Sequence, residues 1–164
     1  TYARGSRDYQ WYGNYTDGSG LTHYTFAHLE QTTVGVTLRL NYTFAPTMSL
    51  QVYAQPFVSK GTYSKVRELS ATPRSRAYAD RYQPYADTSV TNNPGGFNFK
   101  AFQSNVVFRW GYRPGSTLFV VWNQGREGFL GAEGNNSFQD DFRDLLRLHP
   151  SNTFLVKAAY WINR

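Results

Sequence analysis

The alternation of hydrophobic and polar residues predicts two long β-strands near the middle of the sequence. Between residues 33 and 44, an apolar side chain occupies every second position and alternates with a polar residue or glycine. A second alternating run occupies residues 48–55, and Pro46 and Thr47 lie between the two runs. A period of two gives a strand one apolar and one polar face, which a helix cannot do. Two such strands joined by a short turn predict an antiparallel hairpin.

Shorter runs predict further strands before and after this hairpin. Alternation at residues 9–15 and 22–30 predicts two strands, and the DGSG sequence between them favours a turn. Two more strands are expected at residues 102–112 and 117–123, joined by an RPGS turn. The second of these is apolar on both faces, which is typical of a strand that is central in a sheet or covered on both sides.

The pattern changes in two places. Residues 63–96 lose the alternation and are rich in Ser, Thr, Arg, Pro, Tyr and Asn. A segment of this length without regular structure is typical of binding loops, of segments that cover a neighbour, or of disorder. Near the C-terminus, apolar residues at helical spacing predict one helix that ends before Pro150, namely Phe138, Phe142, Leu145 and Leu146. Alternation then returns at residues 153–163 and predicts a last strand.

These elements predict the fold class. A chain of 164 residues is long enough for one domain with a sizeable core, and an aromatic content of 18% favours β-structure. We therefore expect residues 1–164 to form a single all-β domain, with a long irregular insertion at about residues 63–96. Its architecture is predicted to be an antiparallel meander sheet or a complete or partial β-barrel of about 7–8 strands, with one short helix near the C-terminus.

Charge adds a candidate contact surface. The formal net charge is +6, and residues 60–82 supply most of it. A basic loop is typical of a solvated surface, or of a contact with an acidic partner or an anionic lipid headgroup. No nucleic-acid-binding motif accompanies the charge, so no nucleic-acid partner is expected. The residues predicted to contact a partner are Arg74, Arg76, Tyr78, Arg81, Tyr82 and Tyr85.

The sequence offers little for metal binding. It has no cysteine, which excludes disulfides and thiolate metal sites. His23 and His28 are five positions apart on an expected strand, so they should point to opposite faces and should not share a metal. Asp140 and Asp141 are candidate calcium ligands together with Glu133, Asn135 and Asn136, but acidic residues at the start of a helix are already explained by its dipole.

Catalytic motifs are not apparent either. Glu127 with Glu133 or Asp140 is a weak candidate for a glycosidase pair, because a glycine-rich region does not fix the separation of the carboxylates. No nucleophile elbow, zinc-protease motif, Walker loop or dinucleotide fingerprint occurs. We therefore expect a protein that is not an enzyme and needs no cofactor.

Three segments carry a resemblance to a known family. They are LRLNYTFAPTMSLQVYAQPF at residues 38–57, VFRWGYRPGSTLFVVW at residues 107–122 and FLVKAAYWINR at residues 154–164. In this order and spacing they resemble the C-terminal region of DUF5916, a family of large bacterial proteins of uncharacterised function. The resemblance implies a β-rich region similar to an outer-membrane barrel. It also implies that Thr1 is not the start of a family-length protein, and that an N-terminal carbohydrate-binding-like domain of the family is absent here.

The function expected from these observations is structural. We expect a non-catalytic structural or accessory subunit that docks onto a membrane-associated protein complex on its extracytoplasmic side, for example a photosynthetic or respiratory complex. Its partners would be other protein subunits of the assembly, together with lipid or detergent, in the bacterial periplasm or outer membrane. One alternative is an outer-membrane β-barrel or its C-terminal portion. A second alternative is a carbohydrate-binding module that stacks sugars on its aromatic residues.

Overall fold

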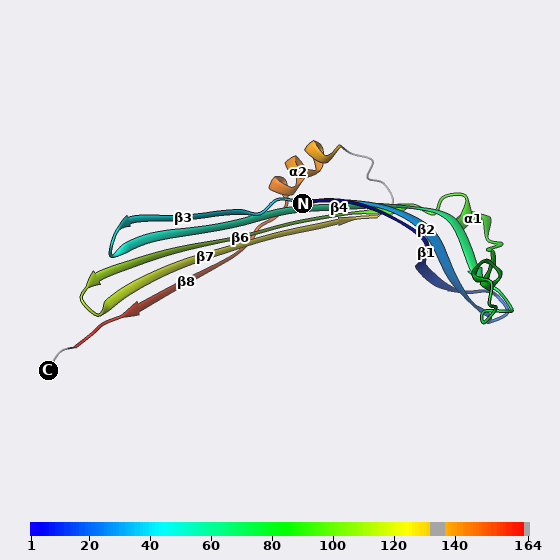
Figure 1. Ribbon diagram of the computed structural model, residues 1–164, viewed down its shortest axis with the longest axis horizontal. Coiled ribbons are helices and arrows are strands. Elements are labelled where there is room, and N and C mark those ends of the chain that lie inside the picture. Colours follow the sequence, from blue (N-terminus) through cyan, green and yellow to red (C-terminus); the bar gives the residue numbers. More distant parts are fainter. Residues whose placement is uncertain (132–136, 163–164) are drawn as a thin grey trace.

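A single antiparallel sheet dominates the computed structural model, which describes residues 1–131 and 137–162 (Figure 1). Its strands are β1 (Tyr2–Thr16), β2 (Thr22–Gly35), β3 (Leu38–Ala45), β4 (Met48–Leu69), β5 (Tyr82–Pro84), β6 (Gly96–Arg113), β7 (Ser116–Leu130) and β8 (Ser151–Ala159). The helical elements are η1 (Tyr78–Arg81), α1 (Thr88–Thr91) and α2 (Phe138–Arg147). The prediction of an all-β fold with one short helix near the C-terminus is confirmed.

The strands follow one another as a meander. The order across the sheet is β1-β2-β4-β6-β7-β8, and β3 and β5 each pair with β4. β2 pairs with residues 57–68 of β4, and β3 pairs with residues 48–54 of the same strand, so β3 continues the line of β2. All neighbours are antiparallel. Within the described residues the sheet is open, because no strand joins its two edges.

The predicted hairpin is confirmed, but its first strand is shorter than the alternation suggested. β3 and β4 pair in register, with Leu40 opposite Val52. The expected strand at residues 33–44 is interrupted between Gly35 and Leu38. At this point the Val36 N–H donates to the carbonyl of Pro56 in β4, at 3.0 Å. Because Pro56 has no N–H to return a bond on the same side, the ladder is broken there.

A second difference concerns the start of the irregular segment. β4 runs to Leu69 instead of ending near residue 63, and Glu68 still pairs with Thr25 of β2. Lys65 has a positive φ of 51°, and the register between β2 and β4 shifts between Phe26 and His28. A bulge of this kind changes which residues share a face. The alternation is therefore lost in the sequence although the strand continues.

The core of this sheet is small. Among the described residues, the buried hydrophobic side chains are Ala27, Leu29, Val58, Val66 and Leu145. The chain exposes 11570 Å², whereas a compact globular protein of its mass exposes about 8,300 Å². The strands are long and lie side by side in one layer (Figure 1). Most of the surface of this layer has no second layer packed against it.

Helix α2 covers one face of the sheet near its middle (Figure 1). Its Ser137 cap accepts a hydrogen bond from the Asp140 N–H, and Leu145 is buried against the sheet. The fully buried Asp141 accepts hydrogen bonds from Asn98 and Lys100 of β6, at 2.8 and 2.9 Å. Its second oxygen lies 2.5 Å from the Nζ of Lys60 in β4. This ion-pair cluster fixes the helix on two neighbouring strands.

The protonation state of Asp141 follows from this cluster. Burial alone would raise the pKa of Asp141, but hydrogen bonds from Lys60, Lys100 and Asn98 hold that pKa below its usual value. Because the folded-state pKa is lowered, the stabilisation is present at neutral pH and is lost as the pH falls below the unfolded value near 3.8.

Replacement of the buried carboxylate should therefore destabilise the fold. Asp141→Asn removes the buried carboxylate that both Lys60 and Lys100 contact, and we expect the free energy of unfolding to fall by about 3 kcal/mol or more. Asp144→Asn is the matched control, because Asp144 lies on the same helix and contacts the same Lys100 at 3.4 Å but is 41% exposed. Its loss should cost less than about 1 kcal/mol. Urea unfolding in detergent micelles measures both values, and equal losses would contradict the assigned role of Asp141.

Candidate functional site

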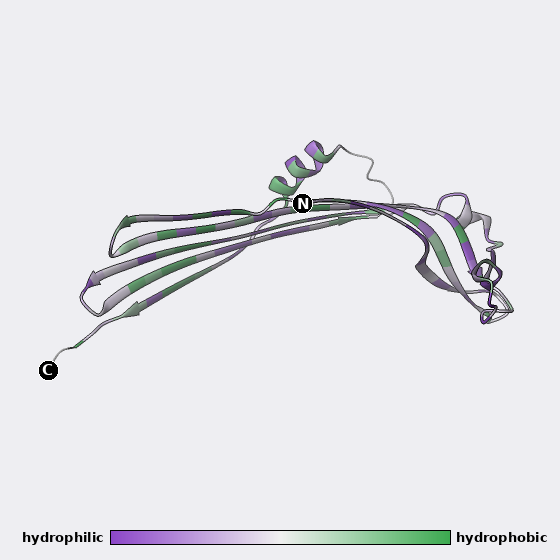
Figure 2. Ribbon diagram, in the orientation of Figure 1, coloured by the Kyte–Doolittle hydropathy of each residue, from purple (hydrophilic) through white to green (hydrophobic). Residues whose placement is uncertain are grey.

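An exposed apolar surface extends over β3, β4, β6, β7 and β8. The strand registers align apolar residues in rows that cross all five strands, and residues in one row share a face of the sheet. We call these residues the belt: Leu40, Val52, Val106, Trp122 and Phe154; Tyr42, Leu50, Phe108, Val120 and Val156; and, on four of the strands, Met48, Trp110, Leu118 and Ala158. Phe44, two residues beyond Tyr42 on β3, is also included, although the register with β4 shifts beside it. Figure 2 shows the corresponding alternation of hydrophobic and hydrophilic residues along these strands.

The belt is open to its surroundings. Leu40 is 54% exposed, Val156 67% and Phe154 70%. In a globular β-protein, a second layer of structure packs on the apolar face of a sheet and buries such side chains. No described residue forms a second layer over the belt, because α2 lies farther along the strands, on Lys60, Asn98 and Lys100.

A polar row ends the belt on the side of α2. It contains Ser104 of β6, Gln124 of β7 and Asn152 of β8, which are opposite one another in the register. On β4 and β3 the same row continues with the apolar residues Ala54 and Leu38. Asn152 accepts hydrogen bonds from the indole N–H of Trp122, at 2.9 Å, and from the Gln124 amide, at 3.1 Å. The ring of Trp122 therefore belongs to the belt, while its N–H is bonded to the polar row.

The opposite face of the same strands carries polar side chains. One row contains Arg39, Tyr53, Asn105 and Asn123. The guanidinium of Arg39 lies over the Tyr53 ring, 5.5 Å from its centroid, and the Asn105 amide donates to the Asn123 side-chain oxygen. These contacts satisfy the polar groups within the row. We refer to this side as the polar face. The next row on the same face also contains three apolar residues, Val107, Val121 and Leu155.

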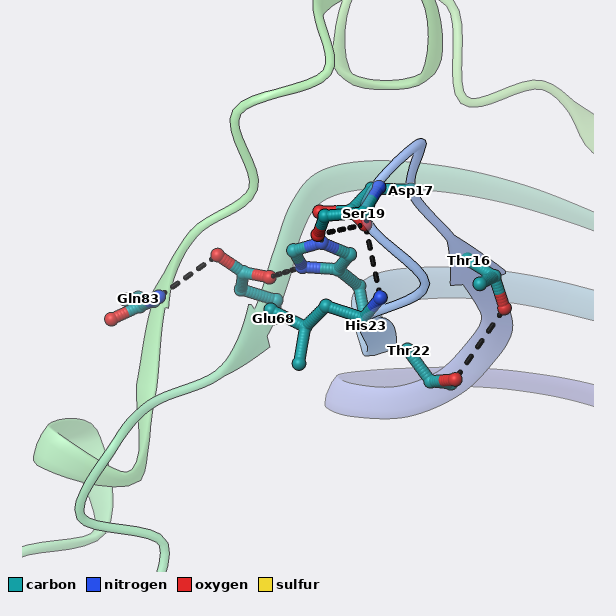
Figure 3. A network of polar contacts seen from close by, with 8 residues as sticks. Thr16, Asp17, Ser19, Thr22, His23, Glu68 and Gln83 are labelled. Carbon is teal, nitrogen blue, oxygen red and sulfur yellow. Dashed lines mark hydrogen bonds and ion pairs between the residues drawn. The ribbon is translucent and has the colours of Figure 1, made fainter.

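A polar cluster (Figure 3) lies at the β1–β2 turn, at the end of the sheet opposite to the β3–β4 and β6–β7 turns. His23, at the start of β2, lies between two carboxylates: its Nδ1 bonds to Glu68 of β4, and its Nε2 lies 3.4 Å from Asp17. Gln83 of β5 donates to the other oxygen of Glu68, at 2.8 Å. The cluster therefore joins the β1–β2 turn, the end of β4 and the irregular segment that follows β4.

Hydrogen bonding shifts the pKa values in this cluster. The bond with Glu68 raises the pKa of His23, and the bond with Asp17 adds to the effect. The pKa of Asp17 is lowered to about 2, mainly by the hydrogen bond from the Ser19 hydroxyl, with a further contribution from the Leu21 N–H. The cluster consequently favours the charged form of His23.

The residues predicted to contact a partner mostly contact their own chain. Tyr82 stacks on Tyr9 of β1 with ring centroids 4.3 Å apart, and Tyr78 meets the same ring edge-on at 4.9 Å. Tyr85 stacks on Tyr15 at 5.8 Å. The Arg81 guanidinium donates to the Ser75 carbonyl at 2.8 Å and lies over the Tyr78 ring. The three tyrosines thus hold the irregular segment on β1 and β2, Arg81 contacts residues within the segment, and Arg74 and Arg76 are exposed.

The candidate metal and glycosidase residues are dispersed. His23 and His28 have separate partners, since His28 bonds to Asp8 at 2.7 Å. Asp141 is occupied by lysines, and Asp140 bonds to Ser137. Within residues 1–131 and 137–162, no group of three His, Asp or Glu residues is placed to hold a metal ion. The remaining candidates, Glu133, Asn135 and Asn136, lie outside the described residues.

These features define the class of protein. It is an antiparallel β-sheet protein that is open along both edges in the described part of the chain and has an apolar belt on one face. None of its described helices is long and apolar enough to cross a membrane. The sequence matches the family described as Domain of unknown function (DUF5916) over residues 2–164, and the chain therefore belongs to this family. No curated protein and no solved structure shows a significant match.

The polar cluster generates a prediction about pH. Because the folded-state pKa of His23 is raised, its contribution to stability is complete below the unfolded value of about 6.5 and is lost as the pH rises through the folded-state pKa. The variant His23→Gln lacks the titrating group, so its stability should not show this loss. The thermal midpoint of wild type should therefore exceed that of the variant at pH 6, and the difference should shrink as the pH rises to 9. His149→Gln, at the exposed His149 after α2, is the control and should retain the wild-type slope. An unchanged slope in His23→Gln would contradict the assignment.

Proposed function

We propose that the belt contacts the hydrocarbon of a lipid bilayer, and that its five strands form part of the wall of an outer-membrane-type β-barrel. The observation that carries this proposal is the set of uncovered apolar rows, which run across β3, β4, β6, β7 and β8. Apolar area in water costs about 25 cal/mol per Å², and large contiguous apolar patches are rare on soluble monomers. A bilayer removes this cost without a second protein layer.

The dimensions of the belt support the proposal. The belt rows cover residues 106–110 of β6, about 13 Å along the strand, and the polar residues that bound them, Ser104 and Arg113, are about 30 Å apart. Strands of membrane barrels tilt by about 40°, so this length corresponds to about 23 Å along the membrane normal. The apolar band of outer-membrane barrels is about 25 Å tall.

Aromatic residues lie at both ends of the belt, as they do in the aromatic girdles of membrane barrels. Near the polar row, Trp122 and Phe154 are stacked with their ring planes 3° apart. Near the turns, the ring centroids of Trp110 and Tyr112 are 6.0 Å apart. Indole and phenol groups favour the interface because one part is apolar and the other forms hydrogen bonds.

The lengths of the connections support an orientation. At one end, Pro46 and Thr47 join β3 to β4, and Pro114 and Gly115 join β6 to β7. Gly115 has a φ of 74°, as a type II turn requires at its third position. At the other end lie the long connections between β4 and β6 and between β7 and β8. Because barrels have short periplasmic turns and longer extracellular loops, the polar cluster around His23 is assigned to the outside.

Further strands complete the barrel in this proposal. The smallest membrane barrels have about eight strands, and five strands carry the belt. In the described part of the chain, the outer edges of β3 and β8 have no paired strand. A bilayer does not tolerate unpaired backbone groups, so these two edges are where additional strands would pair. The polar face then lines the interior, and the function is that of a membrane wall rather than of an enzyme.

In a second candidate function, the belt is covered by protein instead of lipid. Here the chain is a non-catalytic accessory subunit, and other subunits of a membrane-associated complex cover the belt on the extracytoplasmic side. We call the end of the sheet that carries the polar cluster around His23 the distal end. The exposure of Arg74 and Arg76 favours a contact with an acidic partner there. Against this candidate, Tyr78, Tyr82 and Tyr85 pack on β1 and β2 instead of projecting toward a neighbour.

Two neighbouring valines in β7 test the proposal. Val120 lies in the central row of the belt, and Val121 lies on the polar face. In protein reconstituted into lipid vesicles, Val120→Arg should lower the free energy of unfolding by about 2–4 kcal/mol, which is the cost of arginine facing the bilayer midplane. Val121→Arg should cost about 1 kcal/mol or less, because its guanidinium reaches the water-filled interior. Equal costs in vesicles, or a folded monomer that is stable in water without detergent, would overturn the lipid assignment.

A further inference from the structure

Helix α2 presents an exposed basic stripe on the same side of the sheet as the belt. Asp140, Arg143, Leu146 and Arg147 follow one another at helical spacing and are all exposed. Leu146 is 64% exposed, and the Arg143 side chain is 67% exposed. The buried side of the helix consists of Asp141 and Leu145. The stripe therefore points away from the sheet, in the direction in which the belt faces.

The position of α2 along the strands is fixed relative to the belt. Arg126 of β7 donates to the carbonyls of Leu146 and Leu148 at the C-terminal end of the helix. Leu148 also packs on Gly128, where an added Cβ would lie 2.9 Å from its Cδ1. Arg126 is two residues beyond Gln124 of the polar row, a distance of about 7 Å along the strand. The C-terminal turn of α2 consequently lies just beyond the end of the belt.

In the bilayer placement proposed above, this level corresponds to the headgroup region. A bilayer has a hydrocarbon core of about 30 Å and a total thickness of about 40–45 Å, so each headgroup layer begins at the edge of the apolar band and extends for several ångströms. Leu146 is then placed at the boundary of the acyl chains, and Arg143 and Arg147 at the level of the phosphates. Arginine binds phosphate oxygens with two parallel hydrogen bonds.

The acidic residues of the helix leave this stripe cationic. Asp144 is directed to Lys100, at 3.4 Å, and Asp141 is buried. Asp140 is 51% exposed and lies 3.7 Å from Arg143, so it offsets one charge in part. Arg147 belongs to the last helical turn, where the helix dipole favours a cation.

We infer that Arg143, Leu146 and Arg147 form a binding site for the phosphate headgroup of an anionic lipid at the outer edge of the belt. This inference rests on the proposed function, because it requires the belt to be in a bilayer. The site fixes the depth of the sheet in the membrane: the arginines hold the headgroup, Leu146 contacts the first part of the acyl chain, and the Asp141 cluster holds the helix at that level. Each arginine near an anionic membrane surface changes the affinity about fivefold.

The test measures lipid enrichment around the reconstituted protein. Protein is extracted from vesicles of mixed phosphatidylglycerol and phosphatidylcholine, and retained lipids are counted by native mass spectrometry. Arg143→Gln/Arg147→Gln should reduce the enrichment of phosphatidylglycerol by about 25-fold, and Arg143→Lys/Arg147→Lys should reduce it far less. Arg74→Gln/Arg76→Gln removes the same charge from the distal end and should leave the enrichment unchanged.

Other outcomes overturn the inference in distinguishable ways. Equal loss in the α2 and distal variants would show a nonspecific charge effect, and no loss in the α2 variant would exclude the site. Inorganic phosphate should compete weakly, and Leu146→Gln should lower lipid retention; strong competition with no effect of Leu146→Gln would assign the site to free phosphate. Failure of wild-type protein to insert into vesicles, both alone and as an assembly in which the β3 and β8 edges are paired, would overturn the proposed function itself, whereas insertion with unchanged enrichment overturns only the headgroup site.

Discussion

The in-register pairing of five strands is the constraint on which the rest of this structure depends. Each strand alternates apolar and polar residues, but a shift of one residue between two neighbours would place an apolar set on the polar face. The hairpin turns at Pro46 and Gly115 set the register of β3 with β4 and of β6 with β7. Side chains that are separated by many residues, such as Leu40 and Phe154, thereby contribute to one continuous row.

The face that carries the belt changes character beyond the polar row. The same side of β4 and β6 presents Lys60 and Lys100, and α2 covers both with Asp141. On the opposite side, aromatic residues gather around a hollow of about 590 Å³, which is lined by Phe57, Phe97, Phe99 and Phe129 among others. The distal half therefore has its apolar groups on the side that is polar in the belt region. On the face that carries the belt, the sheet thus has an exposed apolar zone and a zone of charged groups, and α2 lies where they meet.

The sequence was informative wherever a short-range pattern decides the structure. The hairpin, the central position of β7 and helix α2 were predictable because alternation, turn residues and helical spacing are local. The break at Val36 depends on Pro56 in another strand, and the bulge at Lys65 hides a strand whose pattern is shifted. The Asp141 cluster joins residues that are 41 or more positions apart, and the belt rows require the register, so neither could be obtained from periodicity alone. We predicted a partner surface on the irregular segment because the local sequence gives no sign that its tyrosines pack on strands of the same chain.

The central claim is that lipid acyl chains contact the belt, and tryptophan fluorescence in vesicles tests it most directly. Trp110 lies in the belt, whereas Trp11 lies on β1 in the distal half. Two proteins are compared, each retaining one of these tryptophans while the other three are replaced by phenylalanine, in vesicles whose acyl chains carry bromine. The account predicts strong quenching of Trp110 and little quenching of Trp11. Weak and equal quenching of both residues in inserted protein would contradict it.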